Sequence, residues 1–260
     1  MCLLAVMHRI HPDAPLVVAA NRDEDPARPA VAMTVLRPAG PRILGGRDEQ
    51  AGGTWLAINE HGVMAGLTNR PGRTKDPGRR SRGELPLALA RFATAREAVD
   101  AFRESYRPAD YGPGWLLVAD REDLFSLDMT AGVQPRVAPL PAGLHVLENQ
   151  PPGTSSPKVR HTAALLQQAL AWRGSRLVEG LGNILGSHVV PAGAAESAHG
   201  TTRVAARQVA CVHAGDYGTR SSLIVLVPAT GRPRLWSAGG PPCTTPFAPF
   251  SALWAPAPAG

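Results

Sequence analysis

Residues 1–24 read MCLLAVMHRIHPDAPLVVAANRDE, and this stretch decides the fold. Two short apolar runs, at 3–7 and 16–20, are separated by a Pro-containing turn from His11 to Pro15. Short apolar runs bounded by turn residues are typical of buried β-strands, so the stretch predicts a hairpin. The second strand ends in the polar tetrad Asn21-Arg22-Asp23-Glu24, which pairing would bring close to the start of the first strand.

Cys2 directly precedes the first predicted strand. The initiator Met is usually removed before a small residue, and its removal would give Cys2 both a thiol and a free α-amine. An α-amine has a pKa of about 8 in model peptides, so it can act as the general base for its own side chain. Arg22 would favour the thiolate, and a carboxylate of the tetrad would hold the ammonium. Taken separately, Cys2 fits an ordinary strand residue and the tetrad a surface turn.

The remaining pattern predicts strand pairs interrupted by helices. Further strands are expected at 31–37, 42–45, 55–59, 63–68, 114–119, 124–128, 145–149, 208–213, 220–227 and 233–237. Two helices are expected within 84–106, the second opened by a Thr94-x-x-Glu97 capping box, and Pro157 opens a longer one. Segregated strands and helices favour an α+β fold with antiparallel sheets, as one domain over 1–260 with a largely irregular tail at 241–260.

The cysteine and histidine patterns predict neither a disulfide framework nor a metal site. Cys2, Cys211 and Cys243 are few and widely spaced, and no two of the eight histidines form a His-x-x-x-His pair. Cys211 is interpreted as a buried strand residue and Cys243 as a loop residue. No cofactor is expected, and the sequence has no haem attachment motif.

The net charge of +6 permits nucleic-acid binding without implying it. One basic cluster comprises Arg70, Arg73, Lys75, Arg79, Arg80 and Arg82. Glycine and proline interleave the cluster and aromatic residues do not, so it fits a solvated loop or an anion-attracting rim better than a stacking platform for nucleic acid. No apolar run reaches the roughly 20 residues of a transmembrane helix, and no signal peptide precedes the first strand, so a cytoplasmic protein is expected.

Five motifs occur in an order that resembles a known family. They are Met1-Cys2-Leu3-Leu4, Asn21-Arg22-Asp23-Glu24, Gly52-Gly53-Thr54-Trp55-Leu56, Thr68-Asn69-Arg70 and Tyr217-Gly218-Thr219-Arg220-Ser221-Ser222. The chain resembles the Asn-Arg-Asp-Glu family, which includes the Transport and Golgi organisation protein 2 group. That family is similar to the choloylglycine hydrolase and penicillin V acylase branch of N-terminal-nucleophile hydrolases. The resemblance implies an αββα four-layer sandwich with the nucleophile on the first strand.

The resemblance also implies roles for individual residues. Catalytic roles fall on Cys2 as nucleophile and base, and on Arg22, Asp23, Asn69, Asn149 and Arg220. Asn69 and Asn149 match residues that hold an oxyanion, although Thr68 is an extra residue before Asn69 and leaves that register open. Asp25 has the spacing of the hydrolase carboxylate and is the alternative to Asp23. Substrate contacts are expected from Asn21, Glu24, Trp55 and Arg70.

The leading functional hypothesis is an amidohydrolase or acyltransferase that acts on a non-peptide C–N bond of a small molecule. An anionic small molecule would suit the positive charges of the arginines. The alternative is a non-catalytic protein that binds or moves haem or lipid in the same pocket, which rests on the resemblance alone. A nucleic-acid partner has only the arginine cluster in its favour and ranks last.

Overall fold

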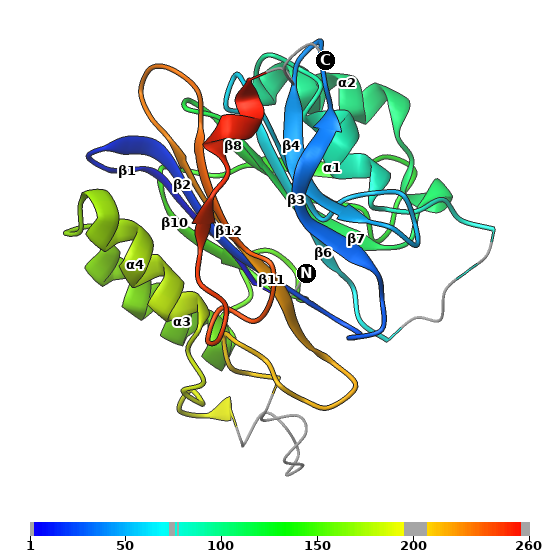
Figure 1. The fold of residues 1–260 in the computed structure, drawn as a ribbon. Helices are drawn as coiled ribbons and strands as arrows, with labels where there is room; N and C mark the ends of the chain where they lie inside the picture. The colour runs from blue at the N-terminus through cyan, green and yellow to red at the C-terminus, as the bar shows by residue number, and fades with distance from the viewer. Residues whose placement is uncertain (1–2, 73–75, 77, 195–206, 256–260) are drawn as a thin grey trace, which may run out of the picture.

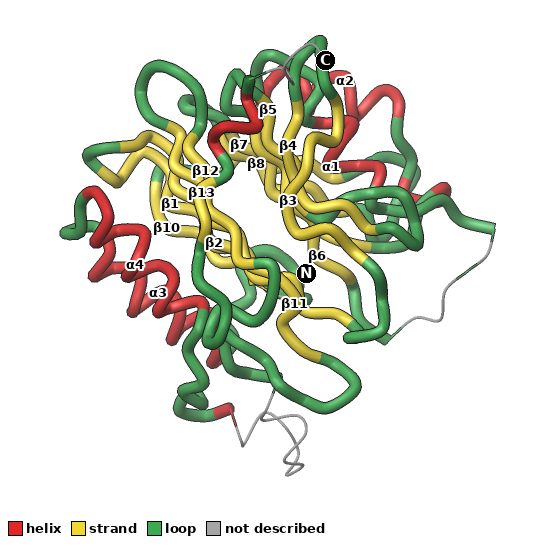
Figure 2. Tube along the Cα trace, in the orientation of Figure 1, coloured by secondary structure: helices red, strands yellow, loops and turns green. Residues whose placement is uncertain are grey.

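Two antiparallel sheets lie face to face, and a pair of helices covers the outer side of each sheet (Figures 1 and 2). This computed structural model describes residues 3–72, 76, 78–194 and 207–255. The order of layers is therefore helices, sheet, sheet, helices. It confirms the predicted αββα sandwich and its antiparallel strands.

The first sheet has the strand order β10-β1-β2-β11-β12-β13 and contains the predicted N-terminal hairpin at its centre. Its strands are β1 (Leu3–His11), β2 (Ala14–Glu24), β10 (Gly143–Leu147), β11 (Gly218–Val227), β12 (Arg234–Ala238) and β13 (Ala248–Pro249). The second sheet runs β3-β4-β5-β6-β7-β8-β9. Its strands are β3 (Ala30–Arg37), β4 (Ile43–Asp48), β5 (Leu56–Asn59), β6 (Met64–Asn69), β7 (Gly114–Ala119), β8 (Leu124–Asp128) and β9 (Arg136–Pro139).

Helices α1 (Glu84–Leu89) and α2 (Ala95–Ser105) pack on the second sheet, and α3 (Pro157–Ala169) and α4 (Gly174–Leu185) on the first. The predicted capping box opens α2, because Thr94 and Glu97 exchange side chain–backbone hydrogen bonds. Two short 3-10 helices are η1 (Pro108–Asp110) and η2 (Ser251–Trp254). No helix among the described residues is long and apolar enough to cross a membrane.

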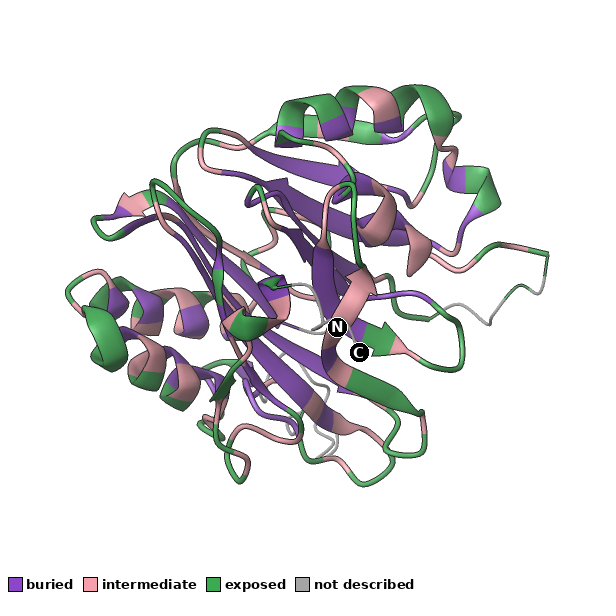
Figure 3. Ribbon diagram, turned by 45° about the horizontal axis from the view of Figure 1, so that its top comes forward, coloured by how far each residue is buried: buried purple, intermediate pink, exposed green. Residues whose placement is uncertain are grey.

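The strands between the two helix layers are largely buried (Figure 3). Strand β2 is buried on both faces, so its side chains alternate between two different cores. Leu16, Val18 and Ala20 belong to the core between the two sheets. Val17 and Ala19 belong to the core between the first sheet and helices α3 and α4. The same alternation continues to the end of the strand. It assigns Arg22 to the face between the sheets, which we call the inter-sheet face, and Asn21 and Asp23 to the helix-facing side.

One sequence prediction needs correction, and two elements were not predicted. Residues 208–213 form bends and one isolated bridge from His213 to Gly218 instead of a strand. In the described part of the tail after Pro241, the regular elements are the short β13 and η2. Helix α4 and the edge strand β9 were not predicted, and the expectation of a single domain stays a prediction.

Helix α4 escaped prediction because its glycines lower the intrinsic helix propensity. One of them has a packing reason: a Cβ on Gly180 would lie only 2.2 Å from the ring of Trp172. Leu177, Leu181 and Leu185 bury one face of the helix against the first sheet. Tertiary burial therefore outweighs the unfavourable local sequence.

Candidate active site

The start of β1 lies between the ends of two neighbouring strands. Leu3 pairs with Asn21 of β2, and Leu4 pairs with Leu147 of β10. The polar tetrad therefore lies next to the start of β1, as predicted, and the segment leading to Asn149 approaches it from the other side. Cys2, the predicted nucleophile, lies outside the described residues.

Arg22 places a buried cation on the inter-sheet face at this end of the sheet. Its side chain is only 3% exposed, and the guanidinium carbon lies 4.4 Å from the centroid of the Trp55 ring. Burial lowers the pKa of Arg22, and the carboxylates of Glu24 and Asp48 oppose that shift. A guanidinium stays protonated in proteins despite such a shift, so Arg22 keeps its positive charge. Stacking on Trp55 adds a favourable cation–π contact.

Asp48 is a carboxylate partner of Arg22 that sequence reasoning missed. Its Oδ2 lies 3.5 Å from Arg22 Nη2 and accepts a 2.7 Å hydrogen bond from Arg28 Nε. Burial alone would raise the pKa of Asp48, but the hydrogen bonds from Arg28 and from the Ala51 backbone hold it below its ordinary value. Asp48 lies at the end of β4 and has no motif around it, so its meeting with Arg22 follows from the sheet packing alone.

Asn21 and Asp23 lie on the opposite, helix-facing side of β2. Asn21 donates to the carbonyls of Leu185 and Ala210, at 2.9 and 2.7 Å, and accepts a 2.6 Å hydrogen bond from Ser222 Oγ. Both amide hydrogens are thereby used, so Asn21 has no donor left for the predicted substrate contact.

Asp23 is the buried member of the two predicted carboxylates. It accepts a 2.6 Å hydrogen bond from Thr219 Oγ1, whereas Asp25 is exposed and accepts from the Ala27 backbone in a turn. Asp23 lies on the face of β2 opposite Arg22, so the carboxylates close to Arg22 are those of Asp48 and Glu24. Glu24 is half-buried, with Oε2 3.9 Å from Arg28 Nε.

Two unpaired donors, Thr68 and Trp115, belong to the same end of the inter-sheet face. They are cross-strand neighbours on β6 and β7, and both are buried. Neither Thr68 Oγ1 nor Trp115 Nε1 has a hydrogen-bond partner among the described residues. The preceding residue, Leu67, donates to the Trp55 carbonyl at 2.8 Å, which ties this end of β6 to the Arg22–Trp55 pair.

Strand alternation on β6 separates Thr68 from Asn69. Leu67 packs in the core beneath α1 and α2, so Thr68 faces the first sheet and Asn69 takes the same side as Leu67. The register that the sequence left open between these two residues therefore favours Thr68 on the inter-sheet face. The change from amide to hydroxyl keeps a hydrogen-bond donor at that position.

Of the other predicted residues, Arg220 and Asn149 are partly buried and Arg70 is exposed. Arg220 occupies a β-bulge between Thr219 and Ser221, which pair with Asp23 and Arg22, and its buried Nε has no hydrogen-bond partner among the described residues. Asn149 is half-buried two residues after β10 ends. Arg70 is exposed, so any contact it makes with a substrate would be at the rim.

Cys211 does not offer an alternative nucleophile. Its side chain is fully buried, and burial together with the adjacent Cys243 thiol raises the pKa of Cys211 to about 12. The thiolate, not the thiol, is the nucleophilic form. The carbonyl of the preceding residue, Ala210, accepts a hydrogen bond from Asn21 on the face of β2 opposite Arg22.

The four layers and the central hairpin define the fold of the N-terminal-nucleophile hydrolases. An N-acylethanolamine-hydrolyzing acid amidase ortholog from Caenorhabditis elegans superposes with a TM-score of 0.52 at 15% identity, over 86% of this chain and 92% of that one. A variant of the conjugated bile acid hydrolase from Clostridium perfringens gives a TM-score of 0.50 at 11% identity, over 96% of each chain. Likeness at these identities establishes the fold alone.

The chain belongs to the Transport and Golgi organisation 2 family, whose model matches residues 1–236. A Transport and Golgi organization protein 2 homolog from Bos taurus is 29% identical over 235 residues, which is 83% of each chain. A homolog from Mus musculus is 41% identical over 73 residues, covering 27% of this chain and 26% of the relative. The family resemblance inferred from the five motifs is confirmed.

Proposed function

We propose that this chain is an amidohydrolase in which Cys2, exposed by removal of Met1, is the nucleophile. The bond cleaved is a non-peptide amide C–N bond of a small molecule. The observation that carries the proposal is the buried Arg22 cation, one residue beyond the Leu3–Asn21 pair in a hydrolase fold. Leu3, the residue after Cys2 in the sequence, pairs with Asn21 at the end of β2, and Arg22 is the next residue of that strand.

Arg22 has the properties needed to activate a thiol. A buried, permanent positive charge stabilises a nearby thiolate and lowers the pKa of its thiol. Asp48, which accepts a hydrogen bond from Arg28, pairs with the Arg22 guanidinium, and Trp55 shields one face of that guanidinium from water. The free α-amine of Cys2 then serves as the base, without any further titratable side chain.

The reaction proceeds in two balanced halves. The Cys2 amine takes the thiol proton while Sγ bonds to the amide carbon, and the carbonyl electrons move to oxygen. The proton then passes to the departing nitrogen as the C–N bond breaks, which releases an amine and leaves a thioester on Cys2. Water, deprotonated by the same amine, attacks the thioester, giving a carboxylic acid and the restored thiol. An amine or alcohol in place of water makes the same chain an acyltransferase.

Donors aimed at the developing oxyanion are the second requirement of this chemistry. Thr68 Oγ1–H is a buried donor that no described group accepts, and Asn149 approaches from the other side of β1. Trp115 Nε1–H lies next to Thr68 and supplies a further unpaired donor. Arg220 and the exposed Arg70 favour a substrate that carries a carboxylate or another anionic group.

The test is hydrolysis of a panel of N-acyl amino acids and N-acyl amines by the purified full chain. We expect turnover of at least one N-acyl amino acid, loss of that turnover in Cys2→Ala, and a thioester on Cys2 detected by mass spectrometry in wild type. His61→Gln, an exposed position on the β5–β6 turn, is the matched control and should keep wild-type activity. Unchanged turnover in Cys2→Ala would overturn the proposal. A haem Soret shift abolished by Arg22→Gln, with no turnover by wild type, would favour the binding alternative.

A further inference from the structure

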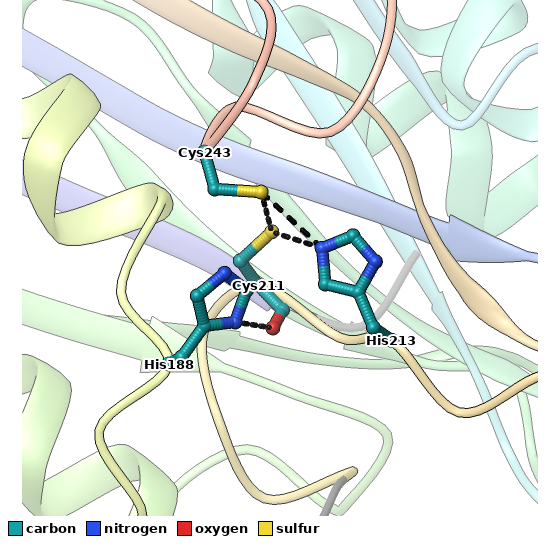
Figure 4. A group of neighbouring side chains, drawn as sticks. All are labelled: His188, Cys211, His213 and Cys243. Carbon is teal, nitrogen blue, oxygen red and sulfur yellow. Dashed lines mark hydrogen bonds between the residues drawn. The ribbon is translucent and has the colours of Figure 1, made fainter.

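Four side chains with sulfur or nitrogen ligand atoms converge from the loops next to α4, β11 and β12 (Figure 4). His188 follows α4, Cys211 and His213 precede β11, and Cys243 follows β12. One candidate ligand atom from each residue lies within 4.8 Å of all the others. The three segments are far apart in the sequence, which explains why no Cys-x-x-Cys or His-x-x-x-His spacing revealed the group.

The distances match the edges of a tetrahedron around a metal ion. Cys211 Sγ lies 3.6 Å from Cys243 Sγ and 3.7 Å from His213 Nε2, and Cys243 Sγ lies 3.2 Å from His213 Nε2. Bond lengths of about 2.3 Å for Zn–S and about 2.0 Å for Zn–N imply S–S and S–N edges of roughly 3.8 and 3.5 Å in a tetrahedral site. The four ligand atoms lie within 4.8 Å of one another, so the most distant pair needs to approach by about 1 Å for all four to bind one Zn²⁺ ion.

We propose that His188, Cys211, His213 and Cys243 bind a Zn²⁺ ion that stabilises the fold. Two thiolates and two imidazoles form a ligand set that suits Zn²⁺ among the common biological cations. Four protein ligands complete a tetrahedral shell and leave no open position for water or substrate. The ion is therefore structural and takes no part in amide hydrolysis.

The surrounding hydrogen bonds prepare His188 for this role. Its Nδ1 lies 3.0 Å from the Cys211 carbonyl oxygen. A carbonyl oxygen only accepts, so Nδ1 carries the proton and Nε2 keeps its lone pair for a metal. Ligating histidines commonly have their second nitrogen fixed in this way. The Cys211 backbone N–H also donates to the Ser187 carbonyl at 3.0 Å, so the two ligand-bearing segments are held together by backbone as well.

The ion would bind the same loops that Asn21 and Asp23 of the polar tetrad contact through hydrogen bonds. Asn21 bonds the carbonyls of Leu185 and Ala210, which precede His188 and Cys211 by three residues and one residue. Thr219, which donates to Asp23, also accepts from the Val212 backbone between the ligands Cys211 and His213. Metal binding should therefore tighten the connection of α4 and the segment before β11 to the end of β2.

The competing structure is a disulfide between Cys211 and Cys243. The two sulfur atoms lie 3.6 Å apart, compared with about 2.05 Å in a disulfide. A disulfide would use two of the ligands and leave the two imidazoles without a role. The convergence of His188 and His213 on the thiols therefore favours the metal.

The experiment measures metal in the full chain, purified without chelators and with a phosphine reductant. Elemental analysis by inductively coupled plasma mass spectrometry should find one equivalent of zinc per chain. After chelation, Co²⁺ titration should give the visible absorption of a tetrahedral thiolate site, and Zn²⁺ should displace it and raise the melting temperature. None of these readouts depends on amide hydrolysis, so the metal site and the proposed function fail or succeed separately.

Cys243→Ser and His213→Asn change two exposed ligands, so the fold should tolerate both, as circular dichroism will show. Each variant should bind Zn²⁺ more than tenfold less tightly, because even changes to groups behind the ligands cost about 10–100-fold. His61→Gln changes an exposed histidine elsewhere and should bind zinc as wild type does. Wild-type affinity in both ligand variants would overturn the proposal. So would a reduced chain that binds no zinc, or a chain purified in parallel without reductant that is lighter by two hydrogens, with Cys211 joined to Cys243.

Discussion

The two faces at the end of β2 differ in how completely their buried polar groups are paired. On the helix-facing side, Asn21 uses both donors and its acceptor within the protein. On the inter-sheet face, Thr68 and Trp115 each bury a donor without a partner among the described residues. An unpaired buried donor costs about 1–3 kcal/mol, so the second arrangement is expensive unless a ligand uses it. We therefore expect the paired groups of the helix-facing side to stabilise the fold, and we propose that the inter-sheet face serves catalysis.

The largest expected effect is a loss of protein stability when the hydrogen bonds on the helix-facing side of β2 are removed. Asn21→Ala removes three buried hydrogen bonds and leaves two backbone carbonyls unpaired, so the free energy of unfolding should fall by about 3 kcal/mol in urea titration. Ser222→Ala removes only one of the three and should cost about 1 kcal/mol. A similar cost for both variants would mean that Asn21 is not the centre of this network.

On the inter-sheet face, the expected effect falls on reactivity. Arg22→Gln removes the buried charge while Arg28 still pairs with Asp48, so turnover of the substrate should drop by tenfold or more, which is about 1.4 kcal/mol in activation free energy. The apparent pKa of Cys2, followed by alkylation rate against pH, should rise. Arg103→Gln, on the exposed face of α2, is the control for a lost arginine. Equal kinetics in the two variants would remove Arg22 from the mechanism.

Two threonines test whether a buried hydroxyl without a described partner lowers the stability of the protein. Thr68→Val replaces a buried hydroxyl without a described partner, so the free energy of unfolding should rise by about 1 kcal/mol while turnover falls. Thr54→Val removes a hydroxyl that donates to the Leu56 carbonyl at 2.9 Å, so stability should fall by about 1 kcal/mol. Thermal and urea unfolding of both variants give the comparison. A loss of stability in Thr68→Val would show that its hydroxyl has a structural partner.

The smallest effect concerns His8, whose side chain is buried away from the site. Burial first, and then the charge of Arg9, lowers the pKa of His8. Below the unfolded pKa of about 6.5, the unfolded chain binds a proton that the folded chain does not, so stability falls as pH decreases. Between pH 7 and 5.5, wild type should lose about 1 kcal/mol more than His8→Leu. Parallel pH dependences would show that the pKa of His8 is not lowered in the folded chain.

The sequence predicted that the tetrad lies next to the start of the first strand. It did not predict which face of β2 each tetrad residue occupies. The hairpin and its tetrad followed from apolar runs and turn residues, which are local signals. The separation of Arg22 from Asn21 and Asp23 needed both faces of β2 to be known as buried. Asp48 and Trp115 carry no motif, because they reach the site through packing between strands distant in the sequence. The four-ligand cluster was invisible for the same reason, and residues 208–213 were misassigned as a strand.

The most direct test of the account is intact mass and N-terminal sequencing of the purified chain, combined with the labelling rate of each cysteine by a thiol-reactive probe. The account predicts that Met1 is absent and that Cys2 reacts at neutral pH much faster than Cys211 and Cys243. A chain that retains Met1, or a Cys2 that labels no faster than the other two cysteines, would contradict the assignment of the inter-sheet face to nucleophilic catalysis.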